Sequence, residues 1–289
     1  MNPYHQLVAE YVRLAQAGQQ CPLGGLADAA QPRLPDTAPK ALIFSPHPDD
    51  ECIIGGLALR LFREAGMHVV NVAVTQGSNR ARQAARLVEL EQACHYLGFG
   101  LLTTLPGGLE KITAAARSAD PAAWREKVQV IANILTRVQP RVIFLPHDRD
   151  WNGTHIGTHW LVVDALRALG PDFACYTVET EFWGAMDNPN LMVESSPADV
   201  ADLMAATSFH VGEVQRNPYH LRQPAWMQDN VRRGGELVGG QGGAAPDCNF
   251  ATLYRLRRWQ AGTWEPVFTG GRVLSAQASP ADLFPESNI

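Results

Sequence analysis

The segment ALIFSPHPDDE, residues 41–51, organises the interpretation of the whole chain. Its first residues, Ala41 to Ser45, form a short apolar run that stops at Pro46, which is typical of a strand buried inside a sheet. The polar residues that follow begin where this strand ends. Because open α/β sheets bind ligands at the carboxyl ends of their strands, we expect the functional site at this junction.

Helices and strands alternate after this junction. Helical patterns cover about residues 56–65, 80–97, 122–138 and 155–169, and strand patterns cover 68–75, 101–105, 141–145 and 173–179. Glycines follow three of the helices as expected of helix C-terminal caps, at Gly66, Gly98 and Gly170. A strand, a helix and a further strand form a right-handed βαβ unit. We therefore predict an α/β fold with a Rossmann-like, doubly wound and mostly parallel sheet over residues 40–180.

The two ends of the chain carry weaker patterns. Residues 1–39 are expected to form an N-terminal helical arm, with Leu7, Tyr11 and Leu14 at helical spacing, and a Gly/Pro-rich linker. After residue 180 we expect C-terminal α+β additions: helices near 196–208 and 224–238, a flexible glycine-rich loop at 239–246 and a strand pair within 249–268. The last 20 or so residues show little pattern and are expected to be loosely ordered.

Composition excludes several classes of protein. The 289 residues carry a formal net charge of -5 and no run of Lys or Arg, which argues against nucleic acid as a partner. No apolar stretch is long enough to span a bilayer, and the N-terminus lacks a secretory pattern, so we expect a soluble, cytoplasmic protein. The 5 cysteines form no CxxC pair, which disfavours a disulfide framework or a thiolate zinc site. No GxGxxG opens a helix after a strand, as a nicotinamide enzyme would require.

The loop after the first strand concentrates chemistry in a few residues. It places one imidazole beside three consecutive carboxylates, and a divalent cation is the simplest way to offset their repulsion. His47 and Asp50 are three residues apart at a turn and can converge on one metal, while Asp49 between them faces a metal-bound water. The alternative is that the carboxylates from Asp49 to Glu51 only cap the following helix.

A second polar cluster, PHDRDWNGTHIGTH at residues 146–159, follows another predicted strand. His155 and His159 are four apart and share a helix face, an arrangement that suits metal or substrate. His155 begins the helix at the sheet edge and is the better metal ligand, whereas His159 either contacts substrate or is a core histidine. Two histidines and a carboxylate are a common catalytic zinc set. Asp148 and Asp150 are expected to order the loop or orient a ligand histidine.

These segments resemble the PIG-L, or LmbE-like, zinc-dependent de-N-acetylases. The motifs that carry the resemblance are PHPDDE at 46–51 and DWNGTH at 150–155. The segment TQGSNRARQAARLVELEQACHYLG is also similar, with Arg86 and Glu89 at recurrent positions of the family. The resemblance covers roughly residues 42–180. It implies a single deacetylase domain over 40–289, in which 181–267 shape the substrate site and 268–289 form a tail.

The resemblance implies that His47, Asp50 and His155 hold one Zn²⁺ per chain and that Asp49 is the general base. Zinc lowers the pKa of its bound water, and Asp49 accepts the proton. The expected reaction hydrolyses a linear amide C–N bond and removes acetyl from an N-acetylglucosamine-type sugar or sugar conjugate. Two alternatives stay open: a metal amidase acting on a larger or non-sugar amide, and a metal-binding homologue without catalysis. Family analogy also suggests a homo-oligomer, a trimer or hexamer.

The chain departs from the family pattern at one position. Many members read HPDH where this chain reads NGTH, so Asn152 replaces a histidine thought to stabilise the oxyanion. Asn152 can still donate an uncharged amide hydrogen bond. His210, in SFHVGEVQ, is the alternative donor, and the bland interpretation is that it is a solvent-facing loop histidine.

Three residues are candidates for substrate binding. Arg80 can contact a sugar hydroxyl or phosphate, although an arginine at the start of an exposed helix is usually only solvated. Trp151 beside the metal loop can stack on a sugar ring, and His159 is the third candidate. For Trp183 and Trp226 we expect core packing instead.

Overall fold

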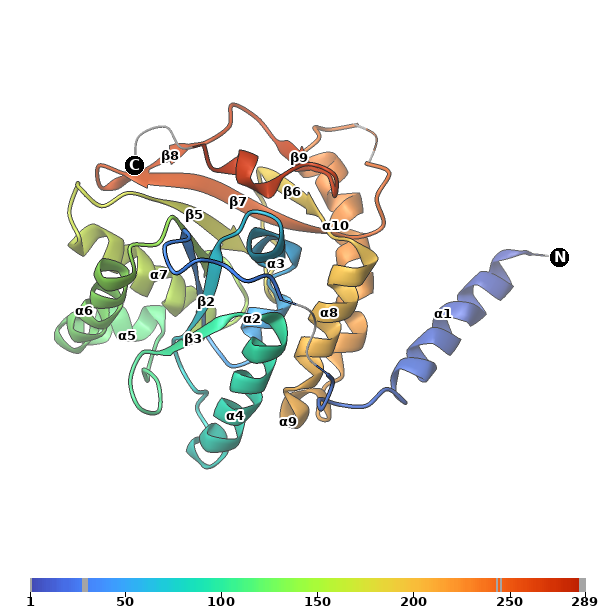
Figure 1. Cartoon of the computed structure of the whole chain (residues 1–289), viewed down its shortest axis with the longest axis horizontal. Helices are drawn as coiled ribbons and strands as arrows, with labels where there is room; N and C mark the ends of the chain where they lie inside the picture. The colour runs from blue at the N-terminus through green and yellow to red at the C-terminus, as the bar shows by residue number, and fades with distance from the viewer. Residues whose placement is uncertain (1, 28–30, 243, 245, 286–289) are drawn as a thin grey trace.

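A nine-stranded sheet forms the centre of the molecule in this computed structural model (Figure 1). The structure describes residues 2–27, 31–242, 244 and 246–285. Its strands are β1 Lys40–Ser45, β2 His68–Ala73, β3 Gly100–Thr103, β4 Val142–Pro146, β5 Cys175–Thr180, β6 Leu191–Glu194, β7 Ala251–Gln260, β8 Thr263–Pro266 and β9 Arg272–Leu274. Parts of the expected arm, linker, glycine-rich loop and tail, at residues 1, 28–30, 243, 245 and 286–289, lie outside the described residues.

The order of the strands confirms the predicted doubly wound sheet. It runs β3-β2-β1-β4-β5-β7-β6-β9, with β8 paired to β7. The first five strands are all parallel, and β1 lies between β2 and β4. The chain first adds β2 and β3 on one side of β1. It then returns to the other side of β1 and adds β4 and β5. Ligands of doubly wound sheets bind at this switch point.

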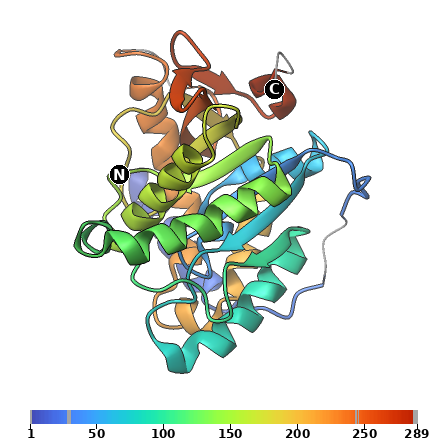
Figure 2. The same ribbon diagram turned by 90° about the vertical axis from the view of Figure 1, so that its left-hand side faces the viewer.

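Helices cover both faces of the sheet, as Figure 2 shows from the side of α6. They are α1 Tyr4–Gly18, α2 Asp50–Ile53, α3 Gly56–Arg63, α4 Arg80–Leu97, α5 Ala114–Ala119, α6 Pro121–Val138, α7 Gly153–Ala168, α8 Pro197–Ser208, α9 Val211–Val214 and α10 Gln223–Leu237. Two short 3₁₀ helices, η1 Tyr219–Arg222 and η2 Pro280–Leu283, complete the set.

The core has two layers because side chains alternate along each strand. In β1, Ala41 and Ile43 pack with residues of α3, α4 and α8 on one face. Leu42 packs on the other face with residues of α6 and α7. A strand buried on both sides must be apolar throughout, which explains why ALIFS reads as a continuous apolar run rather than an alternating one.

The C-terminal part extends the sheet further than expected. The predicted strand pair is present as β7 and β8, and β7 adds antiparallel to β5. No local pattern predicts β6 or β9, which pair with each other in parallel. The expectation of a loosely ordered end is wrong for the described part of the tail, because Leu283 and Phe284 are buried. The buried Arg60 guanidinium also donates to the carbonyl of Ala278 at 2.7 Å.

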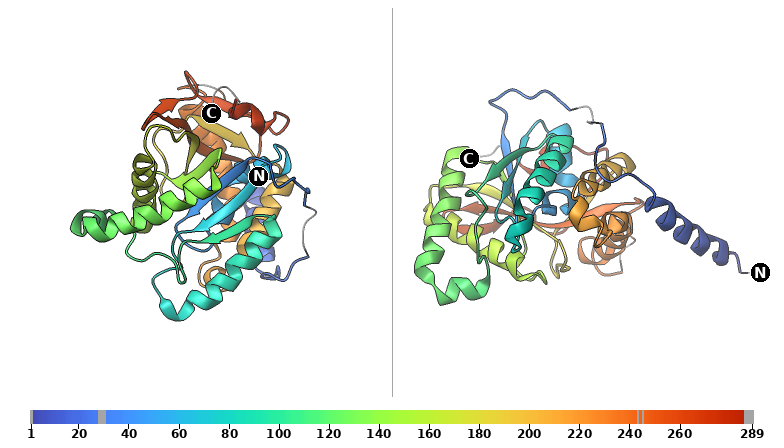
Figure 3. Two further views of the ribbon diagram at one scale, coloured as in Figure 1. Left: turned by 60° about the vertical axis from the view of Figure 1, so that its left-hand side comes forward. Right: turned by 90° about the horizontal axis from the view of Figure 1, so that it is seen from below.

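Helix α1 stands apart from the sheet and its helices (Figure 1 and Figure 3). None of its residues is buried. The chain after it returns to the body, where the Gly24 amide donates to Ser208 Oγ at 3.2 Å and Leu23 and Leu34 pack against the core. Within the described residues, no helix has the length and apolar character needed to cross a membrane.

Candidate active site

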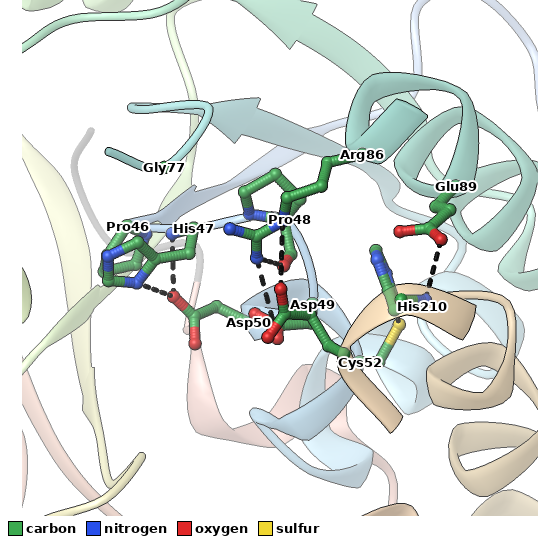
Figure 4. A network of polar contacts seen from close by, with 12 residues as sticks. Pro46, His47, Pro48, Asp49, Asp50, Cys52, Gly77, Arg86, Glu89 and His210 are labelled. Carbon is green, nitrogen blue, oxygen red and sulfur yellow. Dashed lines mark hydrogen bonds and ion pairs between the residues drawn. The ribbon is translucent and has the colours of Figure 1, made fainter. Parts of the chain in front are cut away.

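The loops after β1 and β4 meet at the carboxyl edge of the sheet, because these two strands are paired. Asp49 has a φ of 117°, a left-handed conformation that is uncommon for a residue with a side chain. This sharp turn before α2 sends successive carboxylates to different sides. Figure 4 shows Asp50 turned toward His47 and Asp49 turned toward Arg86. The backbone turn therefore directs the side chains of Asp49 and Asp50 to different sides of the loop.

His47, Asp50 and His155 bring three potential ligand atoms together. His47 Nδ1 lies 3.2 Å from His155 Nε2. Asp50 Oδ2 lies 3.4 Å from His47 Nδ1 and 3.3 Å from His155 Nε2. Asp50 Oδ1 is buried and has no hydrogen-bond partner in the described chain. A buried carboxylate with one oxygen against two imidazole nitrogens and the other oxygen without a partner fits a divalent metal, and this donor set suits zinc.

Asp150 lies behind the ring of His155, whose Nδ1 is buried and has no closer polar partner among the described residues. Its Oδ1 is 3.5 Å from His155 Nδ1, while Oδ2 accepts the backbone N–H groups of Trp183 and Gly184, both at 3.1 Å. A proton held on Nδ1 leaves the lone pair of Nε2 facing Asp50. Burial alone lowers the pKa of His155, but the carboxylates of Asp50 and Asp150 outweigh it and raise this pKa to about 10. The pocket therefore favours positive charge between these two acids.

Asp49 is the carboxylate that faces the open side of the site. It is nearly buried, its Oδ2 accepts the Tyr219 hydroxyl at 2.6 Å, and Arg86 Nη2 lies 3.8 Å from the same oxygen. Burial, followed by the charge of Asp50, raises the pKa of Asp49 to about 6, against the opposing effects of His210, Arg86 and Tyr219. A carboxyl group with a pKa near neutrality can both accept and return a proton.

A cleft of about 970 Å³ opens above Asp49 and His47. Its wall carries more cationic than acidic side chains. Arg80, Arg82 and Arg86 come from α4, Lys111 from the segment before α5, and Arg216 from the residues after α9. Glu213 pairs with Arg82 at 2.8 Å, lies 3.7 Å from Arg86 and also pairs with Arg216. Two tryptophans, Trp151 and Trp183, line the same cleft. The site therefore combines a candidate metal-ligand set, a buried carboxylate and exposed aromatic rings.

Three of the predicted contacts line the cleft: Asn152, Arg80 and Trp151. Asn152 caps α7, because its Oδ1 accepts the Thr154 amide at 2.8 Å, so its amide nitrogen is the donor end. Arg80 is largely exposed and pairs with Glu110 at 2.7 Å. Trp151 is 79% exposed, as a stacking residue requires and a core residue does not.

Two predicted residues do not reach the cleft. His210 is fully buried behind the loop, where its Nε2 lies 2.6 Å from Glu51 Oε1, so it is neither an oxyanion donor in the cleft nor a solvent-facing histidine. Glu51 Oε2 in turn accepts the Asp49 amide at 3.0 Å, which makes the His210–Glu51 pair a support for the left-handed turn. His159 is the core histidine of the alternative interpretation, with Nδ1 directed at the Pro146 carbonyl at 2.9 Å.

Sequence reasoning missed the wall contributed by the C-terminal part of the chain. Tyr219, from η1, contacts Asp49 across 170 residues of sequence, and no local pattern marks it. Trp183 was expected in the core, but it lines the cleft, lies edge-on to Tyr219 at 5.5 Å and stacks on Trp226 at 6.3 Å. Arg86 was noted only as a family position, and the structure places it against Asp49.

Comparison with known proteins supports this description of the fold. Residues 42–166 match the family model PIG-L, described as GlcNAc-PI de-N-acetylase. A search of the curated proteins finds no match.

Among solved structures, the zinc-inhibited form of teicoplanin deacetylase Orf2 has a TM-score of 0.57 and 14% identity, over 76% of this chain and 98% of that one. The N,N'-diacetylchitobiose deacetylase from Pyrococcus horikoshii has a TM-score of 0.53 and 14% identity, over 91% and 94%. GalB, the 4-carboxy-2-hydroxymuconate hydratase from Pseudomonas putida KT2440, has a TM-score of 0.52 and 17% identity, over 75% and 95%. At these identities the likeness shows a shared fold and leaves the reaction to be argued from the site.

Proposed function

Since residues 42–166 match the PIG-L family model, we propose that this protein is a zinc-dependent hydrolase that removes an acetyl group from an N-acetylated sugar or sugar conjugate. The observation that carries the proposal is the meeting of His47, Asp50 and His155 next to a cleft lined by Asp49. The family match gives the class of reaction, and the geometry gives the residues that would perform it.

His47 Nδ1, His155 Nε2 and Asp50 would hold the metal, and Asp150 would keep the ring of His155 in the ligating tautomer. When bound there, zinc would act as a Lewis acid toward a water and an amide carbonyl. Three protein ligands leave room for both.

We propose that Asp49 accepts and returns the proton. Tyr219 and Arg86 hold its Oδ2, so the orientation of the carboxylate is set before substrate arrives. Its raised pKa lets it take a proton from the attacking water and later return that proton to the leaving amine. Asn152, which lines the cleft, is the proposed hydrogen-bond donor to the developing oxyanion, because His210 is sealed behind Glu51.

The substrate class rests on the aromatic rings and on the related deacetylases. Trp151 and Trp183 offer flat apolar faces at the cleft, which suit the stacking of a sugar ring. Two proteins of this fold are named for deacetylation of teicoplanin and of N,N'-diacetylchitobiose. We propose that the substrates are N-acetylglucosamine-type sugars or their conjugates, and that Arg80 contacts the part of the substrate beyond the sugar ring.

The same fold also serves a hydratase, so a second candidate function has to be tested in parallel. The decisive experiment measures zinc by elemental analysis and amine release from N-acetylglucosamine and its short oligomers. We expect about one zinc per chain, amine release by the wild type, and a loss of at least a hundredfold in kcat for Asp49→Asn with zinc retained. Asp187→Asn, an exposed carboxylate, is the matched control.

Other results would redirect the assignment. Zinc without amine release from any N-acetyl sugar would favour a different amide, a hydration reaction or a homologue that binds metal without turnover. Absence of metal after zinc is supplied would refute the metal site itself and leave the loop after β1 as a helix cap.

A further inference from the structure

Helix α1 carries an apolar face that no described residue covers. Its large apolar side chains are each more than half exposed, namely Tyr4, Leu7, Val8, Tyr11, Val12 and Leu14. The helix has 15 residues, no side-chain N-cap, no acidic residue in its first turn and no basic residue in its last. Isolated helices of this length are marginal in water, because their stability normally comes from packing. The helix therefore requires a partner surface.

The spacing of these residues indicates what kind of partner. Tyr4, Leu7, Tyr11 and Leu14 are alternately three and four residues apart, which places them in one seam along the helix. This spacing is typical of one helix packing lengthwise against another. The opposite side carries polar residues such as Gln6 and Gln16.

A groove lies beside the seam where α1 approaches the body. It has a volume of about 690 Å³. Tyr11 from α1 lines it together with Val231, Gly235 and Cys248, and its rim carries the polar residues Gln228, Arg232, Glu236 and Asn249. The bond from the Gly24 amide to Ser208 holds the chain after α1 against α8. The C-terminal half of α1 thus borders the groove, whereas its N-terminal half projects away from the body, as Figure 3 shows.

We propose that α1 is a dimerisation element and that its partner is α1 of a second copy of this chain. In an antiparallel pair, the projecting half of each helix lies over the groove beside the other. Tyr4 and Leu7 of one copy would then meet Tyr11 and Val231 of the next. The same patch serves on both subunits, so the contact closes as a two-fold dimer.

The apolar area is sufficient for a stable contact. Six half-exposed side chains offer roughly 100 Å² each, so one helix presents about 600 Å². Two helices together with the edges of two grooves reach the roughly 1,200 Å² at which specific interfaces begin. A patch of about 600 Å² lies at the upper end of the largest apolar patches that typical monomers expose.

Charge favours a protein partner over a membrane surface. Helices that lie on membranes are rich in Lys and Arg. Helix α1 has one arginine, Arg13, and it is paired with Glu10 of the same helix at 2.7 Å. The helix thus has no net positive charge to attract anionic lipid.

The test compares two doubly substituted full-length chains with the wild type by sedimentation velocity. Leu7→Glu with Leu14→Glu places two charges in the seam, and Gln6→Glu with Gln16→Glu places the same charges on the opposite face. We expect a wild-type dimer, an intact dimer for the Gln pair, and at least a hundredfold rise in dissociation constant for the Leu pair. All four positions are exposed in the single chain, so thermal unfolding of the body is expected to stay unchanged.

Three results would overturn the proposal. The first is a wild-type monomer at about 100 µM, a concentration at which a micromolar dimer is nearly complete. The second is an assembly that the Leu pair does not dissociate. The third is a monomer that co-sediments with vesicles of phosphatidylcholine and phosphatidylglycerol through α1, which would make a lipid surface the partner.

Discussion

Replacing Asp150 with asparagine tests whether the metal site depends on a residue that does not itself touch the metal. Asp150 Oδ2 accepts two backbone amides, from Trp183 and Gly184, and Oδ1 accepts the Asn152 amide at 2.8 Å while facing His155 Nδ1. Asparagine has only one acceptor oxygen. If that oxygen keeps the bonds to Trp183 and Gly184, the amide N–H₂ group faces His155 Nδ1.

A donor at that place reverses the tautomer of His155. Nδ1 must then accept a hydrogen bond, the ring proton moves to Nε2, and the lone pair that faces Asp50 is lost. Partners of ligating histidines typically change metal affinity by roughly 10- to 100-fold, which corresponds to about 1.4–2.7 kcal/mol. We therefore expect the zinc dissociation constant of Asp150→Asn to rise by this factor.

The assay is a competitive titration of the metal-free protein against a chromophoric zinc chelator, with circular dichroism to verify folding. Asp148→Asn is the matched control, because Asp148 lies two residues away in the same loop and pairs with Arg255 instead of the histidine. Its affinity is expected to stay within about twofold. Equal affinities for the two variants, with both folded, would refute the role of Asp150 in orienting His155.

Three further outcomes follow from other contacts. His47→Ala is expected to lose bound zinc in elemental analysis, whereas His5→Ala, an exposed histidine of α1, retains it; equal zinc in both would remove His47 from the ligand set. Tyr219→Phe removes a hydrogen-bond donor that stabilises ionised Asp49, so the pKa of Asp49 rises. The acid limb of the kcat/KM profile then moves to higher pH, and kcat/KM falls roughly tenfold on the acid side. An acid limb at the wild-type pH would contradict this role of Tyr219. Arg60→Met leaves three carbonyl groups and Glu64 without the buried guanidinium. We expect the free energy of unfolding, measured in urea, to fall by about 3 kcal/mol. A fall of less than about 1 kcal/mol would show that the tail does not depend on Arg60.

The part of the fold predicted from sequence is the part in which local pattern and tertiary structure agree. The helix at Arg80–Leu97 has its predicted bounds, because Gly98 takes a φ of 75° and closes the helix as a left-handed cap. Apolar runs such as Val142–Pro146 are buried on both faces, so their composition alone marks them as strands. These elements form the point at which the strand order reverses, and His47, Asp50 and His155 lie at that edge of the sheet.

The C-terminal part could not be predicted in the same way, since its order depends on distant contacts. Strands Leu191–Glu194 and Arg272–Leu274 have 4 and 3 residues, too few for an alternation to show. His210 illustrates the same difficulty at the site. Its sequence context suggested the cleft, but the buried acceptor that holds it, Glu51, is 159 residues away.

The distribution of these contacts suggests how the site divides its tasks. The candidate metal ligands and Asp49 lie just after the paired parallel strands β1 and β4, so their geometry is set by the sheet itself. The opposite wall, with Trp183, Glu213 and Arg216, comes from segments that follow β5. Such connections tolerate change more readily than sheet edges do. The chemistry is therefore expected to follow the first set of residues, whereas the choice of substrate follows the second, and exchange of the second set between relatives should alter KM more than kcat.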